Sequence, residues 1–169
     1  PLLPLTLYNK YKGLCEPLLL KHTNKNFEGV IFRPATVCGY SPRMRFDLSV
    51  NILTNFAYNK KFINVYGGNQ LRPNLHILDY CDAVIRIINA PKNKIENKIF
   101  NVGQQNMSIL NIAKLVKKII SYKIKQNIKI YKSKSNDKRS YHINSDKIYK
   151  ELNFKPKRNI EDAVIEISK

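Results

Sequence analysis

The feature that most constrains the fold is an alternation, along the 169 residues, of short apolar runs with segments whose apolar side chains recur at helical spacing. Runs typical of buried strands occur at residues 30–32, 63–66, 75–77, 99–102 and 128–131. Helical spacing predicts helices over residues 6–23, from Asp47, from Asp79, from Ser108, over residues 145–152 and from about Ile160. Strands that alternate with helices are typical of the α/β class, which is the predicted fold class.

Residues that cap or break helices refine these boundaries. Asp79 and Ser108 are predicted N-caps, because their side-chain oxygens can accept hydrogen bonds from free N–H groups of the first turn. Asn153 is predicted to end its helix in the left-handed conformation. Pro17 is expected to bend or interrupt the first helix, and residues 35–46 are predicted to form a loop.

The net charge of +18 raises the main alternative function, a basic nucleic-acid-binding module. The densest basic stretch covers residues 123–139. The 23 lysines and seven arginines are, however, scattered among Asn and Ile along the chain. This distribution is typical of solvated lysines on most faces, so nucleic acid is not expected to be the main partner.

The cysteines and the apolar runs bear on cellular setting. Cys15, Cys38 and Cys81 are odd in number, lie far apart and match no paired metal-ligand spacing. We therefore expect no disulfide and no metal site, and a reducing, cytoplasmic location. No apolar run reaches the roughly 18 residues that span a bilayer, so no membrane partner is expected.

Tyr8 and Lys12 are the first candidates for chemistry. They are four residues apart on a predicted helix, so both side chains lie on one face. A nearby ammonium favours the ionised form of a phenol, and such a tyrosine can act as an acid or a base. A chain with 10 tyrosines and many lysines also produces this spacing by chance, so the pair taken alone could be exposed and without function.

The context of this pair follows a recognisable order along nearly the whole chain. The segments are Tyr8 to Lys12, Arg33-Pro34-Ala35-Thr36-Val37-Cys38-Gly39, residues 41–51, Val65-Tyr66-Gly67-Gly68, Arg72-Pro73, His76-Ile77-Leu78-Asp79, Phe100-Asn101-Val102-Gly103, Asp137-Lys138-Arg139 and Leu152-Asn153-Phe154-Lys155-Pro156. In this order and spacing, the chain resembles the extended short-chain dehydrogenase/reductase family, in its NAD-dependent epimerase/dehydratase branch, and in particular the nucleotide-sugar epimerases.

The resemblance implies a fold and a domain organisation. The chain would be the C-terminal half of such an enzyme, with the last part of a Rossmann-like parallel sheet followed by a small α/β substrate-binding lobe. Residues 1–40 would be a remnant of the NAD-binding domain that carries the Tyr-x-x-x-Lys helix, and residues 41–169 would bind the nucleotide sugar. The Gly-rich turn that holds the NAD phosphates is absent from the sequence. We therefore expect the fragment alone to be inactive, and the unpaired edge of the 30–32 strand to cause association or marginal folding.

The resemblance also implies roles for individual residues. Tyr8 would be the catalytic acid/base, and Lys12 would hold the nicotinamide ribose and tune Tyr8. The predicted NAD-binding residues are Tyr8, Lys12, Arg33, Pro34, Ala35 and Val37. The predicted substrate-binding residues are Asn51, Val65, Tyr66, Arg72 and Arg139. The two arginines would bind the diphosphate, because a guanidinium fork matches phosphate oxygens.

Other residues of these segments are expected to be structural or stay undecided. His76 is expected to be structural, and Cys38 is expected to be an unreactive thiol. Arg43 and Arg45 could be substrate contacts or solvated charges.

The sequence leaves the reaction partly open. Epimerisation is favoured over dehydration, decarboxylation and reduction, because it needs only the tyrosine, the lysine and NAD. A homodimer is expected for the full-length protein. Sugar and nucleotide stay open, and a non-catalytic remnant of the enzyme is a further alternative.

Overall fold

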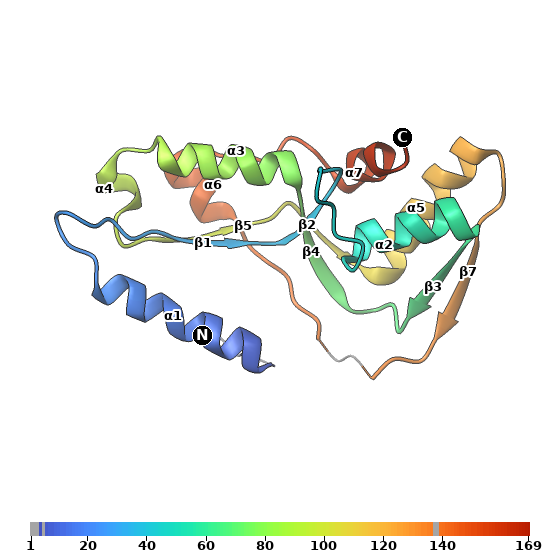
Figure 1. The fold of residues 1–169 in the computed structure, drawn as a ribbon, viewed down its shortest axis with the longest axis horizontal. Helices are drawn as coiled ribbons and strands as arrows, with labels where there is room; N and C mark the ends of the chain where they lie inside the picture. The colour runs from blue at the N-terminus through green and yellow to red at the C-terminus, as the bar shows by residue number, and fades with distance from the viewer. Residues whose placement is uncertain (1–3, 5, 137–138) are drawn as a thin grey trace.

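The computed structural model describes residues 4, 6–136 and 139–169, and its fold is α/β with parallel strand pairs, as expected. Figure 1 shows an elongated arrangement, with the first helix below one end of the molecule and a pair of strands at the other. Two separate hydrophobic clusters form its core, one toward each end.

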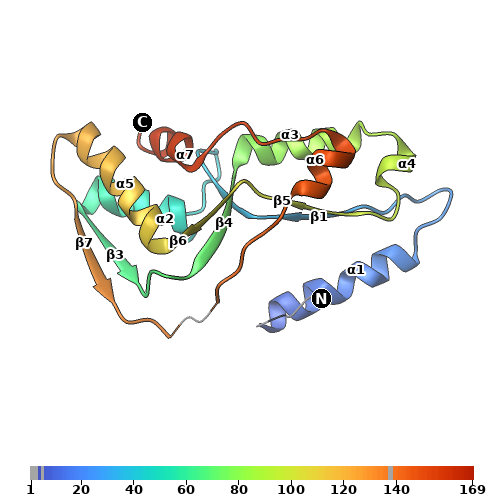
Figure 2. The same ribbon diagram turned by 180° about the vertical axis from the view of Figure 1, so that it is seen from behind.

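The first sheet lies between helices. Strand β1 (Ile31–Pro34) pairs in parallel with β5 (Ile99–Val102). Helix α1 (Leu7–Lys21) lies on one side of these strands, whereas α3 (Ile77–Ile88) and α6 (Asp146–Leu152) lie on the other, in both views (Figures 1 and 2). The buried side chains of this end belong to Ala35, Leu75, Ala83, Ile87, Ile95, Phe100, Val102, Ile148, Leu152 and Phe154. In the part of the chain that the structure describes, β5 is the only strand beside β1, so one edge of β1 is open, as predicted.

The remaining strands connect this end to the other. Strand β2 (Thr36–Cys38) pairs in parallel with β4 (Leu71–His76), and β4 pairs antiparallel with β6 (Gln105–Ser108). Strand β3 (Phe62–Tyr66) pairs in parallel with β7 (Lys129–Ser133). Strand β4 therefore carries the backbone from the β3 end of the molecule back toward β1.

The second hydrophobic cluster lies between β3 and four helical elements. These are α2 (Ser49–Asn55), the π-helix η1 (Phe56–Lys60), α5 (Ile109–Ile124) and α7 (Ile160–Ile167). The buried side chains include Val50, Ile63, Val65, Ile112, Val116, Ile120, Ile128, Ile160 and Val164. As predicted, Ser108 caps α5: its hydroxyl accepts a hydrogen bond from the N–H of Asn111 at 3.2 Å.

Several local predictions need correction. Residues 35–46 are not all loop, because Thr36–Cys38 pair with β4. Pro17 does not interrupt α1, because one missing hydrogen bond does not end a 15-residue helix that continues to Lys21. The short helix α4 (Lys92–Ile95) and strand β6 were not predicted. Asn153 has the predicted left-handed conformation, with φ of 50°.

The predicted domain boundary between residues 40 and 41 stays a prediction, although the sheet that contains β1 takes its second strand, β5, from beyond that boundary. Within the described residues, no helix has the length and apolar character that crossing a membrane requires.

Candidate active site

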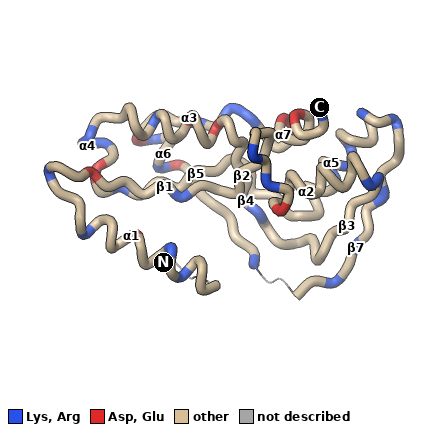
Figure 3. The backbone as a smooth tube through the Cα atoms, viewed as in Figure 1, with Lys and Arg blue, Asp and Glu red and all other residues tan. Residues whose placement is uncertain are grey.

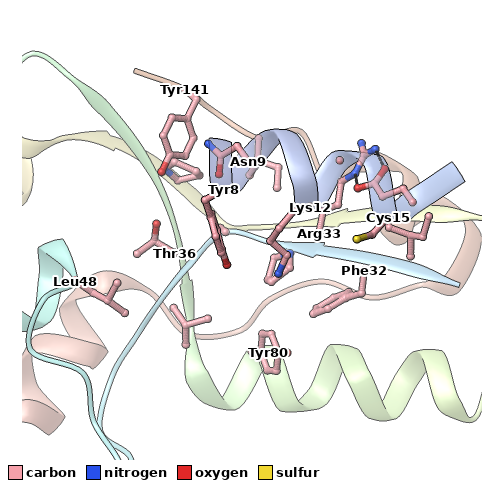
Figure 4. A pocket seen from close by; sticks show the side chains of 18 of the residues that line it. Tyr8, Asn9, Lys12, Cys15, Phe32, Arg33, Thr36, Leu48, Tyr80 and Tyr141 are labelled. Atoms are coloured by element: carbon pink, nitrogen blue, oxygen red, sulfur yellow. Dashed lines mark hydrogen bonds and ion pairs between the residues drawn. The ribbon is translucent and has the colours of Figure 1, made fainter. Parts of the chain in front are cut away.

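A cavity of about 1450 Å³ lies between α1 and the strands β1 and β2. Its walls also include residues 39–48 in part, the start of α3 and residues 141–143. Figure 4 shows Tyr8 and Lys12 directed from α1 into this space, with Thr36, Phe32 and Tyr80 on the opposite side. The cavity is therefore the place where the two candidate catalytic side chains meet the sheet.

Helix α1 places these two side chains. It begins after Thr6, whose hydroxyl accepts a hydrogen bond from the N–H of Asn9 at 3.2 Å. The Lys12 Nζ lies 5.6 Å from the centroid of the Tyr8 ring, so the two side chains share one helix face as the spacing predicts. The Tyr8 side chain is 69% exposed, which leaves it accessible to a bound molecule.

Strand β1 brings Arg33 to the same cavity, where it contacts Glu16 of α1. The Arg33 Nε donates to Glu16 Oε1 at 2.7 Å, and Arg33 Nη2 donates to the second carboxylate oxygen. The hydrogen bonds that Arg33 donates to the Glu16 carboxylate raise the pKa of Arg33, so the guanidinium stays charged. The guanidinium of Arg33 is thus paired with a protein carboxylate. The predicted contact of Arg33 with the cofactor stays a prediction.

The turn after β1 is built by close packing. The N–H of Ala35 donates to the Val102 carbonyl at 2.7 Å, which continues the pairing of β1 with β5. Gly39 has φ of 105°, and a Cβ there would lie 2.9 Å from the His76 Nε2. A glycine is therefore required at this wall of the cavity.

Cys38 is a buried thiol at this turn. Its Sγ lies 3.6 Å from the Leu75 carbonyl oxygen. Burial, with smaller contributions from Glu166 and Asp79, raises the pKa of Cys38 to about 12. The side chain therefore stays a neutral thiol at physiological pH, in agreement with the expected lack of reactivity.

Asn51 holds the loop that follows this turn. Its side chain is buried, its Nδ2 donates to the Arg45 carbonyl at 2.9 Å, and its Oδ1 accepts from the Gly39 N–H at 3.4 Å. Arg45 itself is exposed and pairs with Asp47 through two hydrogen bonds, at 3.0 and 2.6 Å. The amide of Asn51 thus joins two walls of the cavity, and its predicted contact with substrate is untested.

The structure brings together some of the predicted site residues and leaves others apart. Those that line the cavity are Tyr8, Lys12, Arg33, Pro34, Ala35, Val37 and Asn51. Those outside its lining are Val65, Tyr66, Arg72 and Arg139. The Val65 side chain is fully buried in the second core cluster, so only its backbone could contact a substrate, whereas Tyr66 is exposed.

Arg72 and Arg139 lie near each other at the edge of the cavity. Arg72 Nη1 donates to the carbonyl oxygens of Leu71, at 3.0 Å, and Arg139. Its guanidinium carbon lies 5.4 Å from the ring centroid of Tyr141, which lines the cavity. The other two members of the Asp137-Lys138-Arg139 motif lie outside the described residues.

Tyr80 and Tyr141 are cavity residues that sequence reasoning missed. Tyr80 packs edge-on against Phe32, with ring centroids 5.2 Å apart. The only signal for Tyr141 is its position two residues after Arg139, and Tyr80 is one of several half-buried residues of α3. Neither could be distinguished from an ordinary packing residue without the tertiary structure.

His76 and Asp79 are structural residues at the start of α3. His76 is buried, its Nδ1 accepts from the Leu78 N–H at 3.2 Å, and its Nε2 lies 3.0 Å from the Glu166 carboxylate. The predicted N-cap role of Asp79 is wrong, because His76 caps the helix. Asp79 accepts instead from the backbone N–H groups of Lys157 and Arg158, because the chain before α7 packs against it.

Basic side chains are distributed over the whole molecule. Figure 3 shows Lys and Arg spread over most elements, as the sequence indicated. Among the described residues, no group of three or more His, Cys, Asp and Glu side chains could hold a metal ion.

Comparisons with known proteins agree with the order of segments along the chain. The model of the NAD dependent epimerase/dehydratase family matches residues 1–103. The chain is 26% identical to Protein CapI of Staphylococcus aureus over 181 residues, which cover 95% of this chain and 52% of that protein.

Two solved structures show the same fold. The UDP-glucuronic acid 4-epimerase of Bacillus cereus, in complex with UDP-glucuronic acid and NAD, is 25% identical, with a TM-score of 0.81 over 98% of this chain and 52% of its own. Pal of Bacillus thuringiensis is 24% identical, with a TM-score of 0.83 over 99% of this chain and 53% of its own. The chain thus spans about half the length of the relatives it matches.

Proposed function

The chain belongs to the NAD dependent epimerase/dehydratase family, and we propose that it supplies the catalytic Tyr-Lys pair and the sugar-nucleotide site of an NAD-dependent nucleotide-sugar epimerase. The observation that carries this proposal is the position of Tyr8 and Lys12 on one face of α1, both lining a cavity of about 1450 Å³. A cavity of this size is large enough for a cofactor end and a sugar together.

The residues present fit one end of NAD. Within the described residues, the only contact of the Lys12 ammonium is the Tyr8 ring, so its donors are available for ribose hydroxyl groups. Pro34, Ala35 and Val37 line the same cavity. The chain has no Gly-rich turn for the phosphates, so these residues would hold only the nicotinamide ribose end. NAD, when bound, supplies hydride acceptance and return.

Tyr8 is proposed to move the proton. Its phenol oxygen would accept the proton of a sugar hydroxyl in the cavity. It would return this proton to the same sugar oxygen after the sugar has rotated in the site. Lys12 would hold the nicotinamide ribose beside Tyr8, so that the cofactor and the acid/base group meet at the same sugar carbon. The walls formed by Phe32 and Tyr80 would limit the access of water to the sugar.

The substrate is proposed to be a nucleotide sugar. Arg72 and Arg139 would bind its diphosphate, with Asn51, Tyr66 and the backbone of Val65 near the sugar or the nucleoside. Epimerisation is proposed as the reaction because it needs no acid beyond Tyr8. The similarity to the 4-epimerase of Bacillus cereus supports this choice.

We also propose a cytoplasmic location and a homodimeric assembly for the natural protein. The three cysteines are free thiols, which supports a reducing cytoplasm. Helix α1 also carries an exposed apolar stripe, made of Leu7, Tyr11, Leu14 and Leu18, at alternating steps of four and three residues. Such a stripe can pack against a second helix, so it is proposed as the homodimer contact of the natural protein.

The test is turnover of UDP- and dTDP-sugars by the full-length natural protein with NAD. Tyr8→Phe should lower kcat by about 10²-fold or more, because it removes the acid/base group. Tyr122→Phe is the control, since Tyr122 is an exposed tyrosine of α5 that neither lines the cavity nor belongs to the proposed homodimer contact. Equal activity of the two variants would contradict the proposal.

The product identifies the reaction. A 4-epimer of unchanged mass supports epimerisation, whereas loss of water would indicate a dehydratase. An inactive natural protein would favour a non-catalytic remnant. Retention on a polyanion that weakens steeply with salt would favour the nucleic-acid-binding alternative.

The 169-residue chain by itself is proposed to be inactive, because most NAD phosphate contacts would come from residues it does not contain. Isothermal titration calorimetry with NAD should detect no micromolar binding to it.

A further inference from the structure

Helix α1 is held loosely although it carries Tyr8 and Lys12. None of its side chains is buried, in contrast to α3 and α5, whose apolar faces reach the core. Among the described residues, and apart from the bonds to Thr6, His22 and Thr23 at the helix ends, the bidentate ion pair of Glu16 with Arg33 is the only hydrogen-bonded link from α1 to the rest of the protein. The next link lies beyond the helix end, where the Thr23 hydroxyl contacts Asn97.

We propose that Glu16 and Arg33 are positioning residues, which clamp α1 to β1 and thereby hold Tyr8 and Lys12 in place at the cavity. The inference rests on the proposed function, because it assigns the clamp a role in the reaction of Tyr8. Neither residue needs to touch the substrate or the cofactor for this role.

The spacing along α1 supports the proposal. Tyr8, Lys12 and Glu16 are separated by steps of four residues, so the three side chains follow one another on the face directed at β1. Figure 4 shows Tyr8, Lys12 and Arg33 along this face of the helix. The clamp therefore acts on the same surface that presents the catalytic pair.

The geometry of the ion pair makes it suited to a clamp. Its two parallel hydrogen bonds fix direction as well as distance, which a single contact does not. The side chains of Arg33 and Glu16 are only 30% and 17% exposed, so solvent screens them less than a surface pair. Arg33 in turn lies on a strand whose backbone is paired with β5 opposite Asn101.

The length of α1 determines how far Tyr8 moves when the helix tilts. Tyr8 lies 13 residues from Lys21, or about 20 Å at 1.5 Å per residue. If α1 turned about that end by roughly 5°, Tyr8 would move by about 2 Å. A displacement of about 1 Å at a reacting group can lower a rate by roughly 100-fold.

The first arm of the test measures the clamp without any activity. Glu16→Ala removes the carboxylate while Ala keeps the helix propensity high. Amide hydrogen exchange over residues 7–21 should become about threefold faster or more, because a detached helix of this length is marginal in water. Glu151→Ala is the matched control: Glu151 pairs with Lys98 at 2.6 Å, with side chains 32% and 31% exposed, and ties α6 near β5.

The second arm measures catalysis in the full-length natural protein. Glu16→Ala should lower kcat by about 10- to 100-fold and leave the KM of the nucleotide sugar within about twofold, because the residues proposed to bind the diphosphate lie outside α1. Glu16→Gln keeps an acceptor oxygen for Arg33 and should retain more of kcat than Glu16→Ala, with slower exchange of α1. A merely structural role would lower the amount of folded protein without this selective change in kcat at constant KM.

The outcomes separate the clamp from the proposed function. Unchanged exchange of α1 in Glu16→Ala, or an equal effect of Glu151→Ala, would overturn the clamp. An active wild type whose Glu16→Ala variant keeps its kcat would overturn the positioning role. A wild type that turns over no nucleotide sugar would contradict the proposed function, and the exchange of α1 would then decide the clamp by itself.

Discussion

Replacement of Asp79 by Ala is expected to destabilise the fold far more than loss of a helix cap would. The Asp79 side chain is 1% exposed. One carboxylate oxygen accepts from the N–H groups of Lys157, at 3.1 Å, and Arg158, at 2.8 Å, and the other accepts from Arg158 Nη1 at 2.8 Å. The side chain thus joins α3 to the chain segment that leads into α7.

The magnitude follows from the groups left without a partner. Ala leaves two partly buried backbone N–H groups without their acceptor, and each costs about 1–2 kcal/mol, the lower part of the range for buried groups. The Arg158 side chain is 32% exposed, so its guanidinium returns to water at little cost. We therefore expect a loss of about 2–4 kcal/mol, against about 1 kcal/mol for a typical lost N-cap.

The assay is urea unfolding of the 169-residue chain, followed by circular dichroism. Asp82→Ala is the control, because Asp82 lies on the same helix, is half-exposed and has Arg158, at 3.2 Å, as its one ion-pair partner among the described residues. It should change the free energy of unfolding by less than about 0.5 kcal/mol. Asp79→Ala combined with Arg158→Ala should destabilise less than the sum of the single changes, since the two groups share one contact.

Two results would refute this reasoning. One is an Asp79→Ala variant that loses less than about 1 kcal/mol, as an ordinary cap would. The other is full additivity with Arg158→Ala, which would mean that the contact contributes nothing.

Four further predictions concern the thiols, the turn and the sheet edge. In the folded chain, iodoacetamide should modify the exposed Cys15 and Cys81 quickly and Cys38 only on unfolding, as mass spectrometry would show. The pKa of Cys38 is raised in the folded state to about 12, so its contribution to stability is complete below about pH 8.5 and is lost as the pH rises toward 12. The free energy of unfolding should therefore fall more steeply over that window in wild type than in Cys38→Ala, since all other groups are common to both proteins. Gly39→Ala should cost about 1–3 kcal/mol in urea unfolding, because φ is 105° and the new Cβ meets the His76 ring; an unchanged midpoint would contradict this. The open edge of β1 should make the 169-residue chain associate in sedimentation experiments, whereas a sharp, reversible melt of a monomer would argue against it.

Local signals predicted most of the elements, and the failures have a common cause. Strand β5 and helix α5 were predicted because their apolar patterns and caps lie within the element itself. Strands β2 and β6 were missed because they are three and four residues long and exist through pairing with β4. A short strand that forms by pairing with a neighbouring strand has little hydrophobic pattern of its own in the sequence.

The sequence by itself determined that Tyr8 and Lys12 share a face, because a step of four residues on a helix leaves no other arrangement. It also determined the left-handed residue at Asn153 and the strand at 99–102, since both depend on adjacent residues. Only the tertiary structure decided the partners of the charged side chains. Glu16 contacts Arg33 across 17 residues, and Asp79 contacts Arg158 across 79, and no local pattern specifies which of many charges meets which. Such contacts depend on how the elements pack in three dimensions, which is why the candidate pair Tyr8 and Lys12 could be proposed from the sequence while the contacts that support it were found only in the fold.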